Sequence, residues 1–536
     1  MLNVAIVGAG PTGVYTFLSL VRSGTPLSIS IYEKSARAGV GMPYTDDDNT
    51  VMMLANIASI EIPPITSSYL DWLRMQDNGW LNRFGVDKLN LHDRQFLPRT
   101  LLGEYLRNQL LAVVEEAQAR NLCVESHESC EVTDIELADT GVSLFTQGQK
   151  VRERFDLVVI ATGHVWPDDD ETPKGHFPSP WSGLIETKIG ACNVGIMGTS
   201  LSAIDATMAV VAQHGRFVEV ADEALRFDLH SGSDGLHITL MSRSGLLPEA
   251  DFYCPIPYDP LHIATDDAIE KEMAAGTAGL LDRAFTLIAK EISRADPVWS
   301  NRISLTTLDA DSFATAYFAD RKHHAPFHWA EFNLREVERN KRDRCTVPWR
   351  YAILRLHEAV QPIVGKLSAD DRCRFDSGLC KVFVDNYAAV PSESIRRLLA
   401  LHQAKLLSVV ELGDDYQMEV QSERTTIRVD DGALEFDVFI DARGQRPLKT
   451  KDLPFPTLRK QLMASGDEMP DVGEDYTLLE PPLARGRVAI AALPYLMSDR
   501  PFIQGITASA DIGAAIANAA MKPPNRPRKK LLFLTG

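Results

Sequence analysis

The sequence has few cysteines for its length and no long apolar run. Its 536 residues include only seven cysteines, and no two of them are spaced as C-x-x-C. Cysteines of odd number and irregular spacing predict neither a disulfide framework nor a zinc site, so we expect no metal and a reducing, cytoplasmic location. No stretch reaches the eighteen or so apolar residues of a membrane helix, so we expect no membrane contact. The first ten residues lack the basic leader of a signal peptide, and we interpret them as part of the fold.

Basic residues are also in deficit. The chain has 55 Lys and Arg against 73 Asp and Glu, which gives a net charge of −18. Binding of nucleic acid requires a basic surface that neutralises phosphates, so nucleic acid is not an expected partner. The length predicts two or three domains, as in an enzyme that acts on a small-molecule substrate. Nothing in the sequence predicts the oligomeric state.

A glycine-rich motif follows the first predicted strand. The strand covers residues 3–7, the motif G-x-G-x-x-G covers residues 8–13, and residues 14–22 have helical apolar spacing. This order is typical of a Rossmann dinucleotide site, where glycines permit a tight turn and close approach of the pyrophosphate. The next predicted strand, 27–32, ends at an acidic residue that can bind ribose hydroxyls. The residues expected to contact this nucleotide are Gly8, Gly10, Pro11, Thr12, Gly13, Glu33 and Lys34.

Three later segments resemble, in the same order, those of flavoproteins with two dinucleotide sites. Residues 38–43 resemble the second glycine-rich stretch, and a buried strand over 155–160 ends in the A-T-G sequence that these proteins place beside FAD. The alanine-rich helix expected over 508–520 resembles the one that points its N-terminus at the flavin pyrimidine ring. The resemblance implies FAD in the first site. The residues it adds to that site are Gly41, Met42, Thr162, Gly163 and Gly505.

Arg99 stands just ahead of an amphipathic helix expected over about 101–119. Two roles stay open for it, a contact with the FAD phosphates or a surface ion pair. After this helix, short alternating segments between 123 and 155 predict a small antiparallel meander.

A second pattern of strand, loop and helix starts at residue 193. Its spacing is G-x-x-G-x-S-x-S, and small residues permit close backbone approach to a second nucleotide. The next strong strand, 236–241, leads to Arg243, which can bind the 2′-phosphate of NADPH, although a solvated strand-end charge is the alternative. A further strand over 436–440 ends in a turn containing Gly444 and looks like the return to the FAD domain. The loop residues expected to bind NADPH are Gly195, Gly198, Thr199, Ser200 and Ser202.

The Rossmann pattern stops between about residues 251 and 390. Amphipathic segments at 279–295 and 349–367 predict a mostly helical insertion there. The predicted fold is therefore α/β, with two Rossmann-like dinucleotide-binding domains and a helical insertion. The expected boundaries are 1–192 for the FAD-binding domain, completed by 481–536; 193–250 for the NAD(P)-binding domain, completed by 391–480; and 251–390 for the insertion.

The whole chain resembles the YdhS-like family of enterobacterial FAD/NAD(P)-binding proteins, including its segments 53–64 and 161–167. More distantly, it is similar to NADPH-dependent flavin monooxygenases of the N-hydroxylating type. These resemblances imply a fold and the cofactors FAD and NADPH, but no substrate. Residues 175–181 resemble the glycine, histidine and aromatic signature of the monooxygenases, and an ordinary interdomain turn is the alternative interpretation.

The sequence thus predicts an FAD-dependent oxidoreductase that NADPH reduces, acting as a monooxygenase on a small polar or amine substrate. Asn56 is the candidate for a polar contact with the flavin, unless it only caps a turn, and His176 and Trp181 are candidates on the nicotinamide side. The alternatives are a flavin dehydrogenase or reductase without oxygen insertion, and a non-catalytic flavoprotein that senses redox state or nucleotide. Disulfide oxidoreductases of this layout need an early cysteine pair, and no cysteine precedes Cys123.

Overall fold

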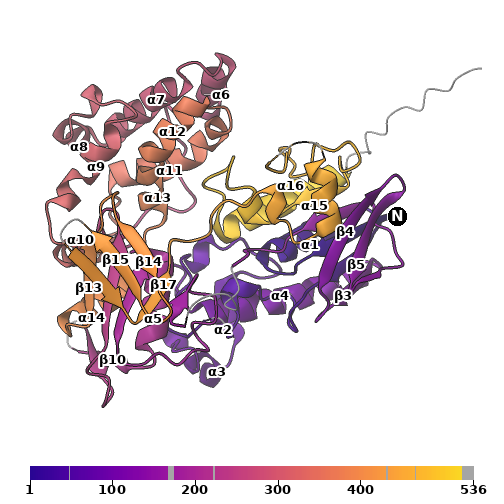
Figure 1. Cartoon of the computed structure of the whole chain (residues 1–536). Coiled ribbons are helices and arrows are strands. Elements are labelled where there is room, and N and C mark those ends of the chain that lie inside the picture. The colour runs from indigo at the N-terminus through magenta and orange to yellow at the C-terminus, as the bar shows by residue number, and fades with distance from the viewer. Residues whose placement is uncertain are drawn as a thin grey trace, which may run out of the picture.

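Two parallel sheets and a helical unit make up the molecule (Figure 1). The computed structural model describes residues 1–47, 49–166, 174–220, 224–429, 432–464, 466 and 468–521. In Figure 1 the first sheet with its helices lies to the right, the second sheet to the lower left, and the helical unit above the second sheet. The predicted α/β fold with two Rossmann-like units and a helical middle region is confirmed.

The first sheet has five parallel strands with β1 at its centre. Val4 of β1 is in register with Ile29 on one side and Leu157 on the other. Strands covered on both faces consist of continuous apolar residues, and all four residues of β7 are buried. In spatial order the strands are β18 (Val488–Ile490), β7 (Leu157–Ile160), β1 (Leu2–Val7), β2 (Leu27–Tyr32) and β3 (Cys123–His127).

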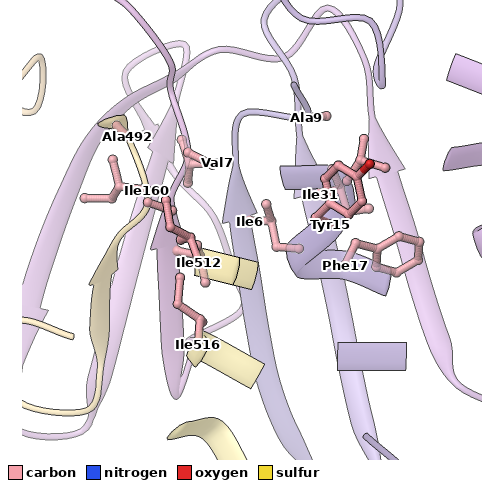
Figure 2. Packing of buried hydrophobic residues seen from close by; sticks show 14 of the residues in the cluster. Ile6, Val7, Ala9, Tyr15, Phe17, Ile31, Ile160, Ala492, Ile512 and Ile516 are labelled. Carbon is pink, nitrogen blue, oxygen red and sulfur yellow. The ribbon is translucent and has the colours of Figure 1, made fainter. Parts of the chain in front are cut away.

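Helices from both ends of the chain pack together beside this sheet. α1 (Pro11–Arg22) packs against α4 (Arg99–Ala119) and against α16 (Gly505–Met521). Figure 2 shows Ile512 and Ile516 of α16 among the buried residues that surround Ile6 and Ile160 of the sheet. The last described helix therefore packs into the core of the first unit. Two short helices, α2 (Tyr69–Met75) and α3 (Asn78–Asn82), precede α4 in the chain.

A meander forms between residues 123 and 155 as predicted, but it starts at Val132, because β3 joins the parallel sheet instead, and its last strand ends at Lys150. Its strands are β4 (Val132–Ala138), β5 (Gly141–Thr146) and β6 (Gln149–Lys150), and α15 (Pro456–Met463) packs on β4. The Gln461 side-chain amide exchanges two hydrogen bonds of 2.9 Å with the Leu137 backbone, and Leu458 is buried in the first core. The segment around α15 thus belongs to the first unit, whereas the predicted boundary placed it in the second.

The second sheet is also parallel. Its strands in spatial order are β13 (Leu407–Glu411), β12 (His237–Ser242), β9 (Asn193–Met197), β17 (Val438–Asp441) and β8 (His176–Phe177). Because β8 pairs with β17, the second unit begins near residue 176 rather than 193. A strand of two residues has no periodicity that a sequence pattern could reveal. The remaining elements of this unit are α5 (Leu201–Val211), α14 (Ser392–Gln403), the hairpin β10 (Gly215–Glu219) and β11 (Leu225–Leu229), and the antiparallel sheet of β14 (Gln417–Val420), β15 (Thr425–Val429) and β16 (Gly432–Phe436).

The helical unit has its own apolar core and contacts both sheet units. Phe502, which lies just ahead of α16, is buried in this core against Phe383, with ring centroids 5.5 Å apart. α10 instead packs on α14 and contributes to the core of the second unit. The helices are α6 (Asp266–Ala274), α7 (Leu280–Ala295), α8 (Pro297–Arg302), α9 (Phe313–Lys322), α10 (Pro326–Asp343), α11 (Pro348–Val364), α12 (Ala369–Ser377) and α13 (Leu379–Tyr387).

Candidate dinucleotide and active site

The glycine-rich loop after β1 leaves no room for side chains at its two ends. A Cβ on Gly8, whose φ is +98°, would lie 2.3 Å from the carbonyl oxygen of Ala161. A Cβ on Gly13 would lie 2.2 Å from the carbonyl oxygen of Gly8. At Gly10 the nearest atom would be Gly41 Cα at 3.4 Å, so the two glycine-rich segments lie together and leave space beside Gly10. The loop therefore forms a cradle that fits a phosphate group.

Glu33 holds this loop in place. One carboxylate oxygen accepts the N–H of Ala9 and the other accepts the N–H of Ser35, each at 2.9 Å. A carboxylate offers about four acceptor positions, so Glu33 can still accept ribose hydroxyls. Lys34 next to it is exposed.

The N-terminal ends of two helices meet beside this loop. α1 starts at Pro11 with Gly10 as its N-cap and no side-chain cap, so its positive end is free for an anion. α16 starts at Gly505, whose φ is +76°. The hydroxyls of Thr12 and Ser509 are 3.0 Å apart, and this contact joins the N-terminal ends of the two helices. Sequence inspection missed Ser509 because nothing in the pattern links it to Thr12.

Unpartnered polar atoms mark the expected position of the flavin. Asn56 Oδ1 and Thr162 Oγ1 are buried, and neither has a hydrogen-bond partner among the described residues. Buried polar groups are nearly always satisfied, so such atoms call for a ligand or water. Met42 starts a short turn after Gly41, and Gly163 has a φ of +74° in the turn that follows β7. These features fit a polar, planar ring system.

Arg99 forms an ion pair, but the pair is buried and not at the surface. Its Nη2 lies 2.6 Å from Asp205 Oδ2, and its Nε donates to the carbonyl of Leu54 at 3.1 Å. Only 13% of the Arg99 side chain and 6% of the Asp205 side chain are exposed, so the ion pair is buried between the two units. Burial raises the pKa of Asp205 to about 6, and the nearby Arg99 opposes this shift. Asp205 lies on α5 and escaped prediction because its partner comes from the other unit.

The second loop is shorter than predicted, because Gly195 lies inside β9 and not in the loop. A Cβ on Gly195 would lie 2.6 Å from the ring of Phe436, so the glycine makes room for that ring and its assignment as a phosphate ligand is wrong. The loop turns at Gly198, whose φ is +133°, and Ser200 is the N-cap of α5 without a side-chain cap. Ser202 lies in the first turn of α5. The positive end of α5 is thus free, as at α1.

Thr199 and Arg243 lie near the end of β12, next to this loop. Thr199 donates a hydrogen bond of 3.4 Å to Ser242 at the end of β12. The next residue, Arg243, has 65% of its side chain exposed, and its Nη1 is 3.7 Å from a carboxylate oxygen of the exposed Asp414. Gly444, with a φ of +86°, follows β17. The Arg243 guanidinium is therefore accessible to a ligand from solvent, which can replace Asp414 as its partner.

His176 and Trp181, predicted to act together, have separate surroundings. The His176 ring stacks on Phe439 at 5.3 Å and its Nδ1 is 3.3 Å from Thr425 Oγ1. Burial lowers the pKa of His176, with Asp441 opposing the shift. These are the contacts of a packing residue at a sheet edge, so the structure gives no support to a nicotinamide contact.

Trp181 belongs to an aromatic column beside the linkers between the units. Its ring stacks on Trp166 at 5.1 Å, and Trp166 stacks on His164 at 5.8 Å. The N–H of Val165 donates to the Gln445 side chain at 3.3 Å, so the outward and return linkers meet here. Burial lowers the pKa of His164, with Gln445 opposing the shift. His164 and Trp166 were not predicted as site residues, because their contact with Trp181 is tertiary.

Two dinucleotide cradles on parallel sheets, with a double linker between them, define the class of FAD/NAD(P)-binding flavoproteins. A family model described as FAD-NAD(P)-binding matches residues 5–165, and one described as YdhS-like middle domain matches residues 265–387. YdhS of Escherichia coli (strain K12) is 60% identical over 533 residues, which cover 99% of this chain and 100% of that protein. The chain belongs to the YdhS family.

Two solved hydroxylase structures are similar to this chain. The reduced form of ornithine hydroxylase (PvdA) from Pseudomonas aeruginosa has a TM-score of 0.50 at 12% identity, covering 97% of this chain and 98% of that one. Ornithine N-hydroxylase of Kutzneria sp. 744 has a TM-score of 0.49 at 16% identity, covering 97% and 99%. The PvdA structure shows that the fold extends over nearly the whole chain. Within the part of the chain that the structure describes, no helix is both long and apolar enough to span a membrane.

Proposed function

We propose that this chain is an FAD-dependent oxidoreductase that NADPH reduces, and that it acts as a monooxygenase on a small polar or amine substrate. The observation that carries the proposal is the pair of uncapped helix N-termini. α1 and α5 each begin directly after a loop of small residues at the carboxyl edge of a parallel sheet. Each of these helices offers free backbone N–H groups to a pyrophosphate. The linkers between the two units meet beside Trp181.

In this proposal the first unit holds FAD. The loop of residues 8–13 and the start of α1 bind its pyrophosphate, and Glu33 binds its ribose. Asn56 and Thr162 bring unpaired oxygens to the polar edge of the ring system, and the start of α16 stabilises negative charge there. FAD supplies the redox chemistry when it is bound. The protein residues orient it, satisfy its polar groups and exclude water.

The second unit holds NADPH in the same proposal. Gly198 and the start of α5 bind the pyrophosphate, with Thr199, Ser200 and Ser202 around it. A 2′-phosphate can replace the exposed Asp414 as the partner of Arg243, and this favours NADPH over NADH. Trp181 stays the predicted aromatic contact on the nicotinamide side.

The ornithine hydroxylase PvdA has this fold over nearly the whole chain, and this likeness supports the choice of a monooxygenase over a reductase. The first test is to identify the cofactor that denatured protein releases, by absorbance and mass, with FAD as the expected result. NADPH should then bleach the bound flavin without oxygen. On rapid mixing with oxygen, a monooxygenase should show a transient near-ultraviolet band before the oxidised spectrum returns. Direct reoxidation without this band would favour a reductase, and failure of NADPH to reduce the flavin would contradict the whole proposal.

The phosphate cradle has a matched pair of variants. A Cβ at Gly10 meets only Gly41 at 3.4 Å, so Gly10→Leu should fold but fill the space of the pyrophosphate. Gly190 has no neighbour of its Cβ within 4 Å and lies outside both loops, so Gly190→Leu is the control. We expect colourless Gly10→Leu protein and yellow control protein. Full flavin absorbance in Gly10→Leu would refute the assignment of the loop.

A further inference from the structure

The helical unit contains a cavity that lies outside both dinucleotide sites. Its volume is about 610 Å³, within the range of roughly 300–1,000 Å³ that is usual for small-molecule sites. Helices α8, α9, α10 and α11 form its walls, and Glu249 of the second unit reaches its floor. None of the residues assigned above to FAD or NADPH lines it.

Aromatic rings form much of the wall. Three of the seven tryptophans of the chain line the cavity, namely Trp299, Trp329 and Trp349. The rings of Trp299 and Trp349 stack at 4.4 Å, and Phe332, which is 56% exposed, lies 5.7 Å from Trp329. Such rings attract flat apolar groups, and their faces also attract organic cations.

The floor of the cavity holds two buried arginines, each with an Nε–H group that makes no hydrogen bond among the described residues. Arg321 is 5% exposed and Arg350 is 2% exposed. Arg350 pairs with Glu249 at 2.7 Å, and Arg321 pairs with Asp385 at 2.6 Å. The Nε of each arginine still has no hydrogen-bond partner among the described residues. An unsatisfied buried donor destabilises the folded state, so an acceptor supplied by a ligand would stabilise this floor.

The rim of the cavity is acidic. Asp296, Asp320 and Glu336 line it, together with Arg302, which is 3.4 Å from Asp320, and the exposed His324 and His328. The floor arginines are already neutralised by Glu249 and Asp385, so a net anion would meet repulsion at the rim. A positive group on the ligand would be attracted there.

We propose that this cavity binds a small zwitterion with a flat apolar body. Its carboxylate lies toward Arg321 and Arg350, its body packs against the tryptophans, and its ammonium group lies at the acidic rim. An aromatic amino acid is the simplest molecule with this order of groups. The inference does not depend on the proposed redox function, because no residue of the cavity belongs to the dinucleotide sites.

Calorimetric titration of the flavin-loaded protein tests the inference with three matched probes. L-phenylalanine has both charged groups, 2-phenylethylamine lacks the carboxylate, and 3-phenylpropanoate lacks the ammonium group. We expect phenylalanine to bind about 10-fold more tightly than either of the others, which is the effect of one lost polar contact of about 1.4 kcal/mol. Absence of phenylalanine binding, or equal binding of either analogue, would overturn the proposal.

Variants test whether phenylalanine binds in this cavity. Ala316 lines it, whereas Thr315, its neighbour on α9, is exposed and does not. Ala316→Trp should abolish phenylalanine binding, and Thr315→Trp should leave it unchanged. If Ala316→Trp fails to fold, Glu336→Gln decides, since it should weaken binding of phenylalanine and 2-phenylethylamine but not of 3-phenylpropanoate. Unchanged phenylalanine binding in folded Ala316→Trp or in Glu336→Gln would refute the site, and flavin reduction by NADPH should be the same in all variants.

Discussion

Replacing Gly513 with alanine tests whether the close crossing of α1 and α16 holds the first nucleotide site together. A Cβ at Gly513 would lie 2.6 Å from Thr16 N and 2.7 Å from the Tyr15 carbonyl carbon, whereas ordinary contacts begin at 3.4 Å. Both atoms belong to the backbone of α1, so no side-chain rotation can relieve the contact. The two helices must move apart, and the contact between Thr12 and Ser509 near their N-termini must lengthen from 3.0 Å.

The expected loss of stability follows from three opposing effects. Overpacking of this kind costs about 1–3 kcal/mol, and loss of the hydroxyl hydrogen bond adds about 1 kcal/mol. The better helix propensity of alanine returns about 1 kcal/mol. The free energy of unfolding should therefore fall by about 2 kcal/mol, and less FAD should stay bound because the two helix N-termini separate.

Gly365→Ala is the matched control. Gly365 ends α11 with φ of −70° and ψ of −6°, and a Cβ there would have only Asp499 O at 3.9 Å. It should leave stability unchanged or raise it by up to about 1 kcal/mol. Urea unfolding followed by flavin absorbance, with the ratio of FAD to protein measured in the same samples, compares the two variants. Equal midpoints and full FAD content in Gly513→Ala would refute the reasoning.

Three further predictions concern single charged residues. Arg243→Ala should raise KM for NADPH by about 10-fold or more and leave that for NADH nearly unchanged, because only NADPH has a 2′-phosphate; an equal effect on both nucleotides would remove this role. Glu33→Gln should weaken FAD binding by about 10-fold, because one of the two backbone N–H groups of Ala9 and Ser35 loses its acceptor; an unchanged Kd for FAD would contradict it. The pKa of Asp205 rises from 3.8 to about 6 on folding, so the folded state binds the proton more tightly than the unfolded state. The stabilisation of the folded state by this proton is complete below pH 3.8 and is lost as pH rises through about 6. Asp205→Asn should remove that part of the pH dependence, about 3 kcal/mol in unfolding free energy, and an unchanged pH profile would refute the assignment.

The sequence by itself determined the features that depend on neighbours in the chain. The loop of residues 8–13 was predicted with its strand and helix, because the steric need for glycine and the change from strand to helix periodicity are local. The helix expected over 101–119 is observed as Arg99–Ala119, and the one over 279–295 as Leu280–Ala295. Glu33 was found in the same way, from its place at the end of a strand.

Only the tertiary structure decided what each residue faces. Gly195 has the composition of a phosphate loop, but the ring of Phe436, from another strand, fills the space beside it. Arg99 could not be assigned from sequence, because its partner Asp205 reaches it only when the two units pack. The role of a charge or a glycine depends on which distant segment folding places beside it. Local patterns therefore predicted the first dinucleotide cradle, while the contacts between the units followed from packing.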